Sequence, residues 1–181
     1  MRPPAAVVAV LVALAGACAS SSPPRPGAVP PTTEPGPAAA AEFEAPVSLG
    51  VLDDDGLTES SGLAASRRNP DLLWTHNDSG DSARLYCLTR AAKRCGTWRV
   101  SGAEAVDWED MAAGPGPVAG EHYLYAGDIG DNGRSRGSIV VYRVVEPIAP
   151  RPDGGEATTA PADVVRLRYE DGAHNAEALL V

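Results

Sequence analysis

The sequence is poor in basic residues, and lysine is almost absent. Its 181 residues include 15 Lys or Arg against 24 Asp or Glu, which gives a formal charge of −9 and an isoelectric point of about 4.7. Only Lys93 is a lysine, and the basic residues form no cluster. Because proteins bind nucleic acid by neutralising phosphates with Lys and Arg, we do not expect a nucleic-acid partner.

Long apolar runs are also missing. The uncharged apolar run at residues 5–14 is too short for a membrane-spanning helix of about 20 residues. It follows Arg2 and precedes small residues, which is the layout of a secretory signal. Residues 14–18, LAGAC, resemble a bacterial lipobox, in which the cysteine, here Cys18, is lipidated and becomes the mature N-terminus. The alternative is ordinary signal cleavage after Ala17.

Residues 19–46 offer almost nothing to bury, because Pro, Ala, Ser and Thr dominate them. Such a composition is typical of a disordered or polyproline-like tether. The predicted organisation is a lipoprotein signal peptide at 1–18, a Pro/Ala-rich linker at 19–46 and a folded domain at 47–181. We expect an exported protein, anchored by lipid at the outer face of the cytoplasmic membrane or otherwise secreted.

Cysteine is scarce, with three residues in the chain. If Cys18 carries lipid, Cys87 and Cys95 remain as a pair in an oxidising compartment, where structural disulfides persist. They flank a polar connector between two strand-like runs, which predicts a bridge across a hairpin. Two free buried thiols are the alternative.

An internal repeat is the strongest pattern in the chain. With Glu59 set over Glu109, ESSGLAASRRNPDLLWTHNDSGDS aligns without a gap over EDMAAGPGPVAGEHYLYAGDIGDN. Each copy continues with two more strand-like runs, and no helical periodicity interrupts them. The predicted strands are residues 59–66, 71–76, 84–89 and 97–102 in the first copy, and 109–116, 122–127, 138–145 and 163–170 in the second.

Four strands in about 45 to 65 residues are the size of one β-propeller blade. The sequence therefore predicts an all-β domain of two four-stranded blades, with the start of a third at residues 174–181, HNAEALLV. Closed propellers typically need 4–8 blades. We therefore expect this chain to be a fragment or a truncated product of a longer protein, or to receive its missing blades from elsewhere.

Five stretches carry a resemblance to known proteins: ESSGLAASRRNPDLLWTHNDSGDSARLY, DWEDMA, YAGDIGDN, VYRVVEP and HNAEALLV. Together they resemble an uncharacterised group of actinobacterial secreted proteins and lipoproteins with a propeller-like fold, distantly similar to phytase-like β-propellers. The resemblance covers roughly residues 50–181. Phytase-like propellers bind calcium, but only the acidic character of the loops is matched here, and no known catalytic residue.

Acidic residues recur at the ends of the predicted inner strands. Hard oxygen ligands of this kind suit calcium, which takes 6–8 of them. The alternative is that Asp and Gly form Asx-type turns repeated by ancestry. The candidate ligands are Glu59, Asp78, Asp81, Glu109, Asp128, Asp131, Asn132 and Glu177.

The stretch VDWED adds Asp107 and Asp110. Asp107 and Glu109 alternate with Trp108, so their side chains should share one face, whereas Asp110 should face the other way. Paired carboxylates can perform acid/base catalysis if burial or proximity separates their pKa values; solvated turn residues are the alternative.

The three histidines show no metal-ligand spacing, and neither a Gly-x-Ser-x-Gly elbow nor a phosphate-binding glycine loop occurs.

The sequence thus predicts a lipid-anchored cell-envelope protein that binds an unidentified small molecule or envelope ligand, with calcium as its ion. A calcium-dependent hydrolase of phosphoesters or similar small anions is the enzyme alternative. A truncated remnant without a function of its own is the third.

Overall fold

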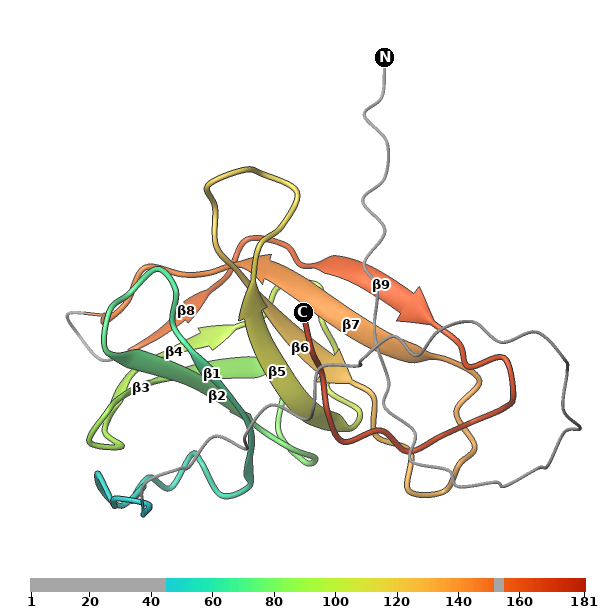
Figure 1. The fold of residues 1–181 in the computed structure, drawn as a ribbon, viewed down its shortest axis with the longest axis horizontal. Coiled ribbons are helices and arrows are strands. Elements are labelled where there is room, and N and C mark those ends of the chain that lie inside the picture. Colours follow the sequence, from blue (N-terminus) through green and yellow to red (C-terminus); the bar gives the residue numbers. More distant parts are fainter. Residues whose placement is uncertain (1–44, 152–154) are drawn as a thin grey trace, which may run out of the picture. The chain divides into compact units, whose positions relative to one another are not determined.

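The computed structural model describes residues 45–151 and 155–181. These residues form nine β-strands in two sheets and no helix, so the prediction of an all-β fold is confirmed (Figure 1). All nine strands belong to one unit that includes residues 49–181. The predicted signal peptide and nearly all of the predicted linker lie outside the described residues. Within the described part, no helix is long and apolar enough to cross a membrane.

The first sheet is an antiparallel meander with one added strand. Its strand order is β1-β2-β3-β4-β8, and β8 pairs in parallel with β4. The strands are β1 (Ser60–Ala65), β2 (Leu72–Asn77), β3 (Arg84–Thr89), β4 (Arg94–Arg99) and β8 (Glu156–Thr158). The first three agree with the predicted strands of the first copy, whereas β4 lies three residues earlier than the predicted strand at 97–102. β8 was not predicted, since EAT is too short to show an alternating pattern.

The second sheet repeats the meander in the order β5-β6-β7-β9. Its strands are β5 (Trp108–Gly114), β6 (Tyr123–Asp128), β7 (Ile139–Val145) and β9 (Asp163–Leu167). All four were predicted. Residues 174–181, expected to begin a third copy, form no strand, because no described strand offers them a ladder of backbone partners. Two sheets that do not close on themselves establish the all-β class but not a propeller.

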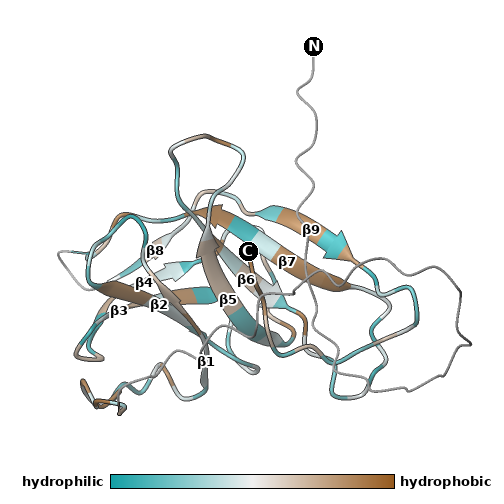
Figure 2. Cartoon of the chain, in the orientation of Figure 1, coloured by the Kyte–Doolittle hydropathy of each residue, from teal (hydrophilic) through white to brown (hydrophobic). Residues whose placement is uncertain are grey.

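A shared core joins the two sheets. Alternate residues of β2, β3, β6 and β7 point into it, as the two-residue period of a strand requires, and the hydrophobic residues of β7 are visible in Figure 2. Trp74 packs edge-on against Trp98 with ring centroids 5.0 Å apart, and Trp108 packs beside Tyr142. The buried members include Ala64, Trp74, Leu85, Cys87 and Trp98 from the first sheet and Trp108, Met111, Leu124, Ala126, Val140, Tyr142 and Val144 from the second.

The two copies are structurally equivalent in a register that differs from the sequence alignment. Trp74 faces the shared core, but Leu124, its partner in the alignment, faces back toward the first sheet. Tyr125 lies on the opposite face of β6, turned away from the first sheet. If equivalent faces of the two sheets point the same way, Trp74 of β2 corresponds to Tyr125 of β6. Equivalent residues of these two strands are then 51 residues apart in the sequence, not 50 as in the alignment.

Hydrogen bonds at the strand ends support the shifted register. The side chain of Asn77 accepts a bond from the backbone N–H of Glu59, and Asp128 accepts one from that of Asp107. The next residues, Asp78 and Ile129, donate their backbone N–H to the carbonyls of Glu59 and Asp107, respectively. Asn77 therefore corresponds to Asp128, and the sequence alignment of Asp78 with Asp128 is wrong for the folded chain.

A buried carboxylate, Glu146, fastens the end of the second sheet to the first. It follows β7 and is 0% exposed. Its Oε1 accepts hydrogen bonds from Ser66, Asn69 and Trp74, and its Oε2 accepts bonds from the backbone N–H groups of residues 67 and 68. Five donors converge on one carboxylate, so this group anchors the loop between β1 and β2. Sequence analysis did not single out Glu146.

Cys87 on β3 and Cys95 on β4 lie beside each other as free thiols, with Sγ atoms 2.9 Å apart. Burial and the neighbouring Cys95 raise the pKa of the Cys87 thiol, so oxidation should begin at the less buried Cys95. The disulfide itself stays a prediction.

We expect mass spectrometry of protein oxidised without reductant to find the Cys87 and Cys95 peptides linked. The bridge should stabilise the fold by at most about 2–3 kcal/mol, because it closes a short loop. Dithiothreitol should therefore lower the melting temperature of the wild type and leave that of Cys95→Ser unchanged. Recovery of both cysteines as free thiols after oxidation would refute the bridge.

Candidate functional site

Three carboxylates converge where β2 ends and β5 begins. Asp78 follows β2, Asp107 precedes β5, and Glu109 lies within β5. One carboxylate oxygen from each lies within 4.8 Å of the other two. The predicted common face of Asp107 and Glu109 is therefore confirmed. Asp110 is directed elsewhere, since its Oδ2 accepts a hydrogen bond from the backbone N–H of Leu179.

A β-bulge places Glu109 in this site. On β5, Trp108 pairs with Asp128 and Asp110 pairs with Gly127, so Glu109 is an extra residue opposite no partner on β6. Bulges of this kind redirect side chains and are common beside functional sites. Asp107 is held by backbone bonds to its carbonyl from the N–H groups of residues 129 and 130, at 3.2 and 3.1 Å.

Gly130 allows the loop after β6 to lie directly against the carboxylates. A Cβ atom at this position would stand 2.3 Å from Oε1 of Glu109 and 2.4 Å from Oδ2 of Asp107. Both distances are shorter than a Cβ contact allows, so a side chain at this position would displace the two carboxylates. The glycine of the GDIGDN stretch therefore serves close approach to the acidic site.

The three carboxylates lack basic partners. None of them forms an ion pair with a described residue, and Oδ1 of Asp78 is buried without a hydrogen-bond partner. Glu109 is only 7% exposed, and its carboxyl bonds to another carboxyl, that of Glu177. Two carboxyls can share a hydrogen bond only if one of them keeps a proton.

The pKa values reflect this crowding. Burial, the bond to Glu177 and the charges of Asp78 and Asp107 raise the pKa of Glu109 to about 7. Burial and the charge of Asp78 also raise the pKa of Asp107, although Arg136 opposes the shift. The site thus holds excess negative charge that a proton or a cation must balance.

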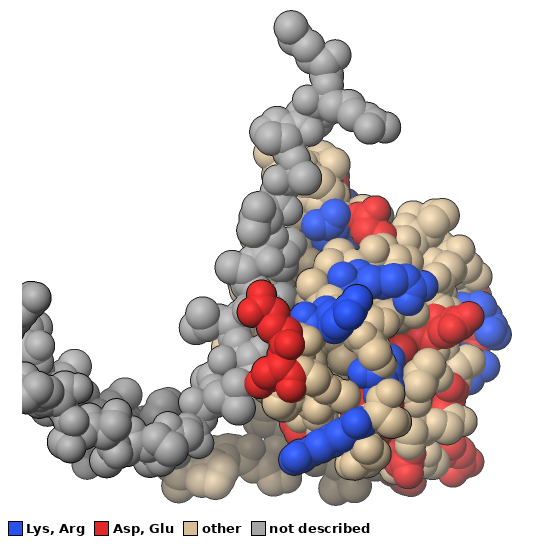
Figure 3. Space-filling view, turned by 90° about the vertical axis from the view of Figure 1, so that its right-hand side faces the viewer, with Lys and Arg blue, Asp and Glu red and all other residues tan. Residues whose placement is uncertain are grey.

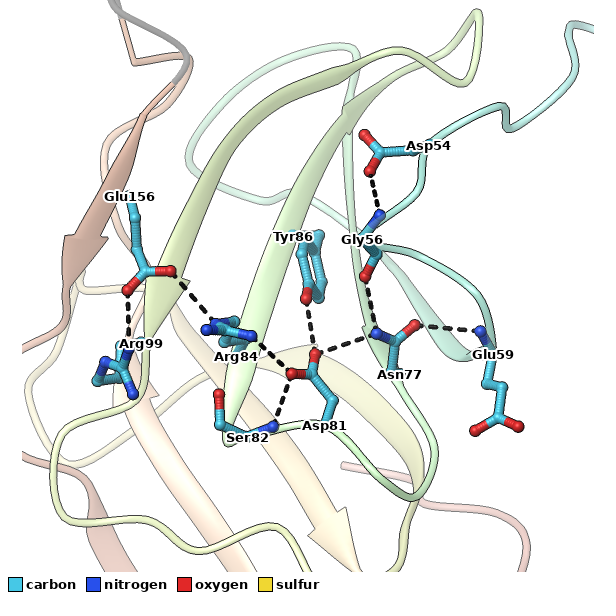
Figure 4. Close-up of polar contacts among 10 residues, drawn as sticks. All are labelled: Asp54, Gly56, Glu59, Asn77, Asp81, Ser82, Arg84, Tyr86, Arg99 and Glu156. Atoms are coloured by element: carbon cyan, nitrogen blue, oxygen red, sulfur yellow. Dashed lines mark hydrogen bonds and ion pairs between the residues drawn. The ribbon is translucent and has the colours of Figure 1, made fainter.

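Asp81, another candidate ligand, is surrounded by protein donors (Figure 4). Its carboxylate accepts bonds from the side chains of Asn77, Arg84 and Tyr86 and from the backbone N–H of Ser82. Burial raises the pKa of Asp81, but these donors outweigh it and leave the pKa lowered. Burial and the contact with Asp81 raise the pKa of Tyr86 to about 12. This geometry is that of a structural turn carboxylate.

Asp128 and Asp131 are likewise engaged by the protein. Asp128 is 1% exposed, accepts the backbone N–H of Asp107 and pairs with Arg136 at 2.7 Å. Asp131 accepts the backbone N–H groups of Ser135 and Arg136, and the first of these bonds contributes most to lowering the pKa of its carboxyl.

The remaining candidates lie at the margin of the site. Asn175 links two of them, because its Nδ2 donates to Asn132 at 3.3 Å and to Glu177 at 2.6 Å. Glu59 is exposed, and its backbone groups bond to Asn77 and Asp78. The structure thus brings Asp78 and Glu109 together, places Glu177 beside them, and adds Asp107, which sequence analysis considered for acid/base chemistry but not as a ligand.

Two histidines each bond to a neighbouring group, although Nε2 of His76 is buried without a hydrogen-bond partner. His76 is fully buried, its Nδ1 lies 2.8 Å from the carbonyl of Asn77, and its ring packs edge-on against Trp108. Burial lowers its pKa, so the ring is neutral at pH 7. His174 bonds to Asp171 at 2.9 Å.

Comparison of the chain with family models, curated proteins and solved structures gave no match.

Proposed function

We propose that this chain is a lipid-anchored binding protein of the cell envelope whose two sheets are consecutive propeller blades and whose inner acidic site holds a calcium ion. The observation that carries the proposal is the convergence of Asp78, Asp107 and Glu109 within 4.8 Å without a basic partner. A bound cation would remove the mutual repulsion of these carboxylates and give the unpartnered Oδ1 of Asp78 a partner.

The donor set favours calcium over other common ions. All three groups offer carboxylate oxygens, whereas zinc sites are usually built with Cys or His. Calcium accepts six to eight oxygen ligands in flexible geometry and tolerates water among them. Glu177, whose carboxyl contributes to raising the pKa of Glu109, would be the fourth carboxylate of the set.

Two observations support the propeller arrangement: the order of the strands in each sheet, and the direction in which equivalent residues of the two sheets face. β1 and β5 open the two meanders and lie beside each other, since the hydroxyl of Ser61 donates to the backbone carbonyl of Glu109 at 2.7 Å. The corresponding residues Trp74 and Tyr125 face the same way along the stack. Blades of a propeller share both properties, and their first strands surround the axis. The acidic site would then lie toward that axis.

A binding role fits the charge distribution. The face shown in Figure 3 carries both basic and acidic side chains. Bound calcium would provide a positive centre in an otherwise acidic protein.

The raised pKa of Glu109 favours one enzymatic alternative, in which this residue serves as a general acid in metal-dependent hydrolysis of phosphoesters or similar anions. Metal-dependent turnover would distinguish that enzyme from a binding protein.

Isothermal titration calorimetry with calcium tests the proposal. Calcium must displace the proton that Glu109 holds with a pKa of about 7, so binding should be about tenfold weaker at pH 6 than at pH 8. Glu109→Gln should abolish the heat of binding at both pH values, whereas Asp163→Asn, at an exposed carboxylate on β9, should change neither the affinity nor its pH dependence. Absence of heat at both pH values would refute the calcium site.

The lipid anchor is tested separately at Cys18. The wild-type protein should partition into detergent, because several acyl chains hold a protein firmly at a membrane. Cys18→Ser should move it to the aqueous phase or mislocalise it. Equal partitioning of the two forms would contradict the lipoprotein assignment.

A further inference from the structure

A cavity of about 240 Å³ lies between two segments at one end of the second sheet. Residues 135–139 lead into β7 and residues 168–174 follow β9, both on the right-hand side of Figure 1. Ile139 at the start of β7 pairs with Leu167 at the end of β9, so the two segments leave the sheet at the same end. All lining residues except Ile139 are exposed or half-buried, so the cavity opens to solvent.

The lining of this cavity is basic, in a chain whose formal charge is −9. It includes Arg136, Arg168 and His174, and no Asp or Glu is among the described residues that line it. The cavity beside the loop between β2 and β3 of the first sheet is lined instead by Asp55, Glu59 and Asp81, with Arg84. The repeat therefore does not account for the basic lining.

Arg168 provides a positive charge that the protein does not neutralise. Its side chain forms no ion pair or hydrogen bond with a described residue. Arg136, in contrast, pairs with Asp128 at 2.7 Å and donates to the carbonyl of Gly130 at 2.7 Å. Arg136 thus holds the loop in place, whereas Arg168 is free to bind. A guanidinium can donate two parallel hydrogen bonds to one carboxylate or phosphate group.

His174 and Tyr169 line the cavity together with Arg168. Nε2 of His174 lies 2.9 Å from Oδ1 of Asp171, and the imidazole packs edge-on against Tyr169 with ring centroids 5.0 Å apart. These two contacts fix the orientation of the imidazole. The ring of Tyr169 also packs against the apolar cluster that contains Ile139. The cavity therefore offers apolar surface beside its charged groups.

We propose that this cavity binds a small organic anion, a molecule that carries one carboxylate or phosphate group on an apolar body. Arg168 would hold the anionic group, and the exposed hydroxyl of Ser138 would donate a further hydrogen bond to it. Tyr169 and Ile139 would contact the apolar body. The volume approaches the roughly 300–1,000 Å³ of ligand sites. The inference goes beyond the calcium site, because none of the proposed calcium ligands lines this cavity.

The amide chemical shifts of the full chain, titrated in EDTA with benzoate, phenyl phosphate and benzyl alcohol, test this proposal. The three probes share an aromatic ring, and only the first two carry a charge. We expect at least one anion to shift the resonances of residues 135–139 and 168–174 with a dissociation constant of about 1 mM, and benzyl alcohol to bind at least about tenfold more weakly. The tighter anion identifies the preferred group. No shifts with either anion, or equal binding of benzyl alcohol, would overturn the proposal.

Arg168 and Arg166 provide a matched pair of variants. Both are exposed and neither pairs with a described residue, but Arg166 lines a different cavity. Arg168→Gln should weaken binding of the anion at least about tenfold, and Arg166→Gln less than about twofold. Equal losses in both variants would indicate general attraction to a basic surface and would contradict the site. Because the titration contains EDTA, its result does not depend on whether calcium binds.

Discussion

Replacing Glu146 by glutamine is expected to lower the free energy of unfolding by about 3 kcal/mol. The carboxylate accepts five hydrogen bonds in a fully buried position. An amide has one oxygen and a donor group, so it would leave either the two backbone N–H groups or the three side-chain donors unsatisfied. Thermal unfolding of Glu146→Gln should show a melting temperature lower by roughly 10 °C.

Glu121→Gln is the matched control for this change. Glu121 pairs with Arg68 at 3.3 Å, but 40% of its side chain is exposed, and exposed ion pairs contribute about 0–1 kcal/mol. The control should melt within about 2 °C of the wild type. If the two variants melt alike, Glu146 does not anchor the loop between β1 and β2.

Calcium is expected to stabilise the folded protein by about 2.7 kcal/mol at a concentration one hundred times the dissociation constant. Glu109→Gln should abolish this gain. Without calcium, the raised pKa of Glu109 means that the folded state binds more protons than the unfolded state between about pH 4.5 and pH 7. The stability that Glu109 contributes should therefore fall as pH rises through this window, and Glu109→Gln should reduce that fall.

Asp128→Asn distinguishes the acidic site from the neighbouring turn. Asp128 bonds to backbone N–H groups and to Arg136, so its replacement should lower stability equally with and without calcium. The comparison requires melting curves of the wild type, Glu109→Gln and Asp128→Asn at pH 8, each measured with calcium and with EDTA. Loss of the calcium gain in Asp128→Asn but not in Glu109→Gln would contradict the assigned ligands.

The strands were predictable because each contains an alternating or β-branched run bounded by turn residues. The runs LLWTHN and IVVYRVV, for example, became β2 and β7. β8 was not predictable, because its three residues are held by parallel pairing to β4, a partner about 60 residues earlier in the chain. Glu146 was not predictable either, since its five donors meet only when the two sheets pack.

The acidic site was predicted in part. The alignment gave Asp78 and Asp128 the same role, but the fold shifts β2 and β6 by one residue, so that Asn77 corresponds to Asp128. The bulge that redirects Glu109 depends on pairing between β5 and β6. Asp107 lies two residues before Glu109, and that spacing in VDWED was the one signal for its part in the site.

The most direct test of the calcium site is an anomalous difference map from crystals grown with strontium in place of calcium. We expect one strong peak in contact with the carboxylates of Asp78, Asp107 and Glu109, and none in crystals of Glu109→Gln. A map without a peak between these three carboxylates, or with its peak at Asp81 or Asp131 instead, would contradict the proposed site.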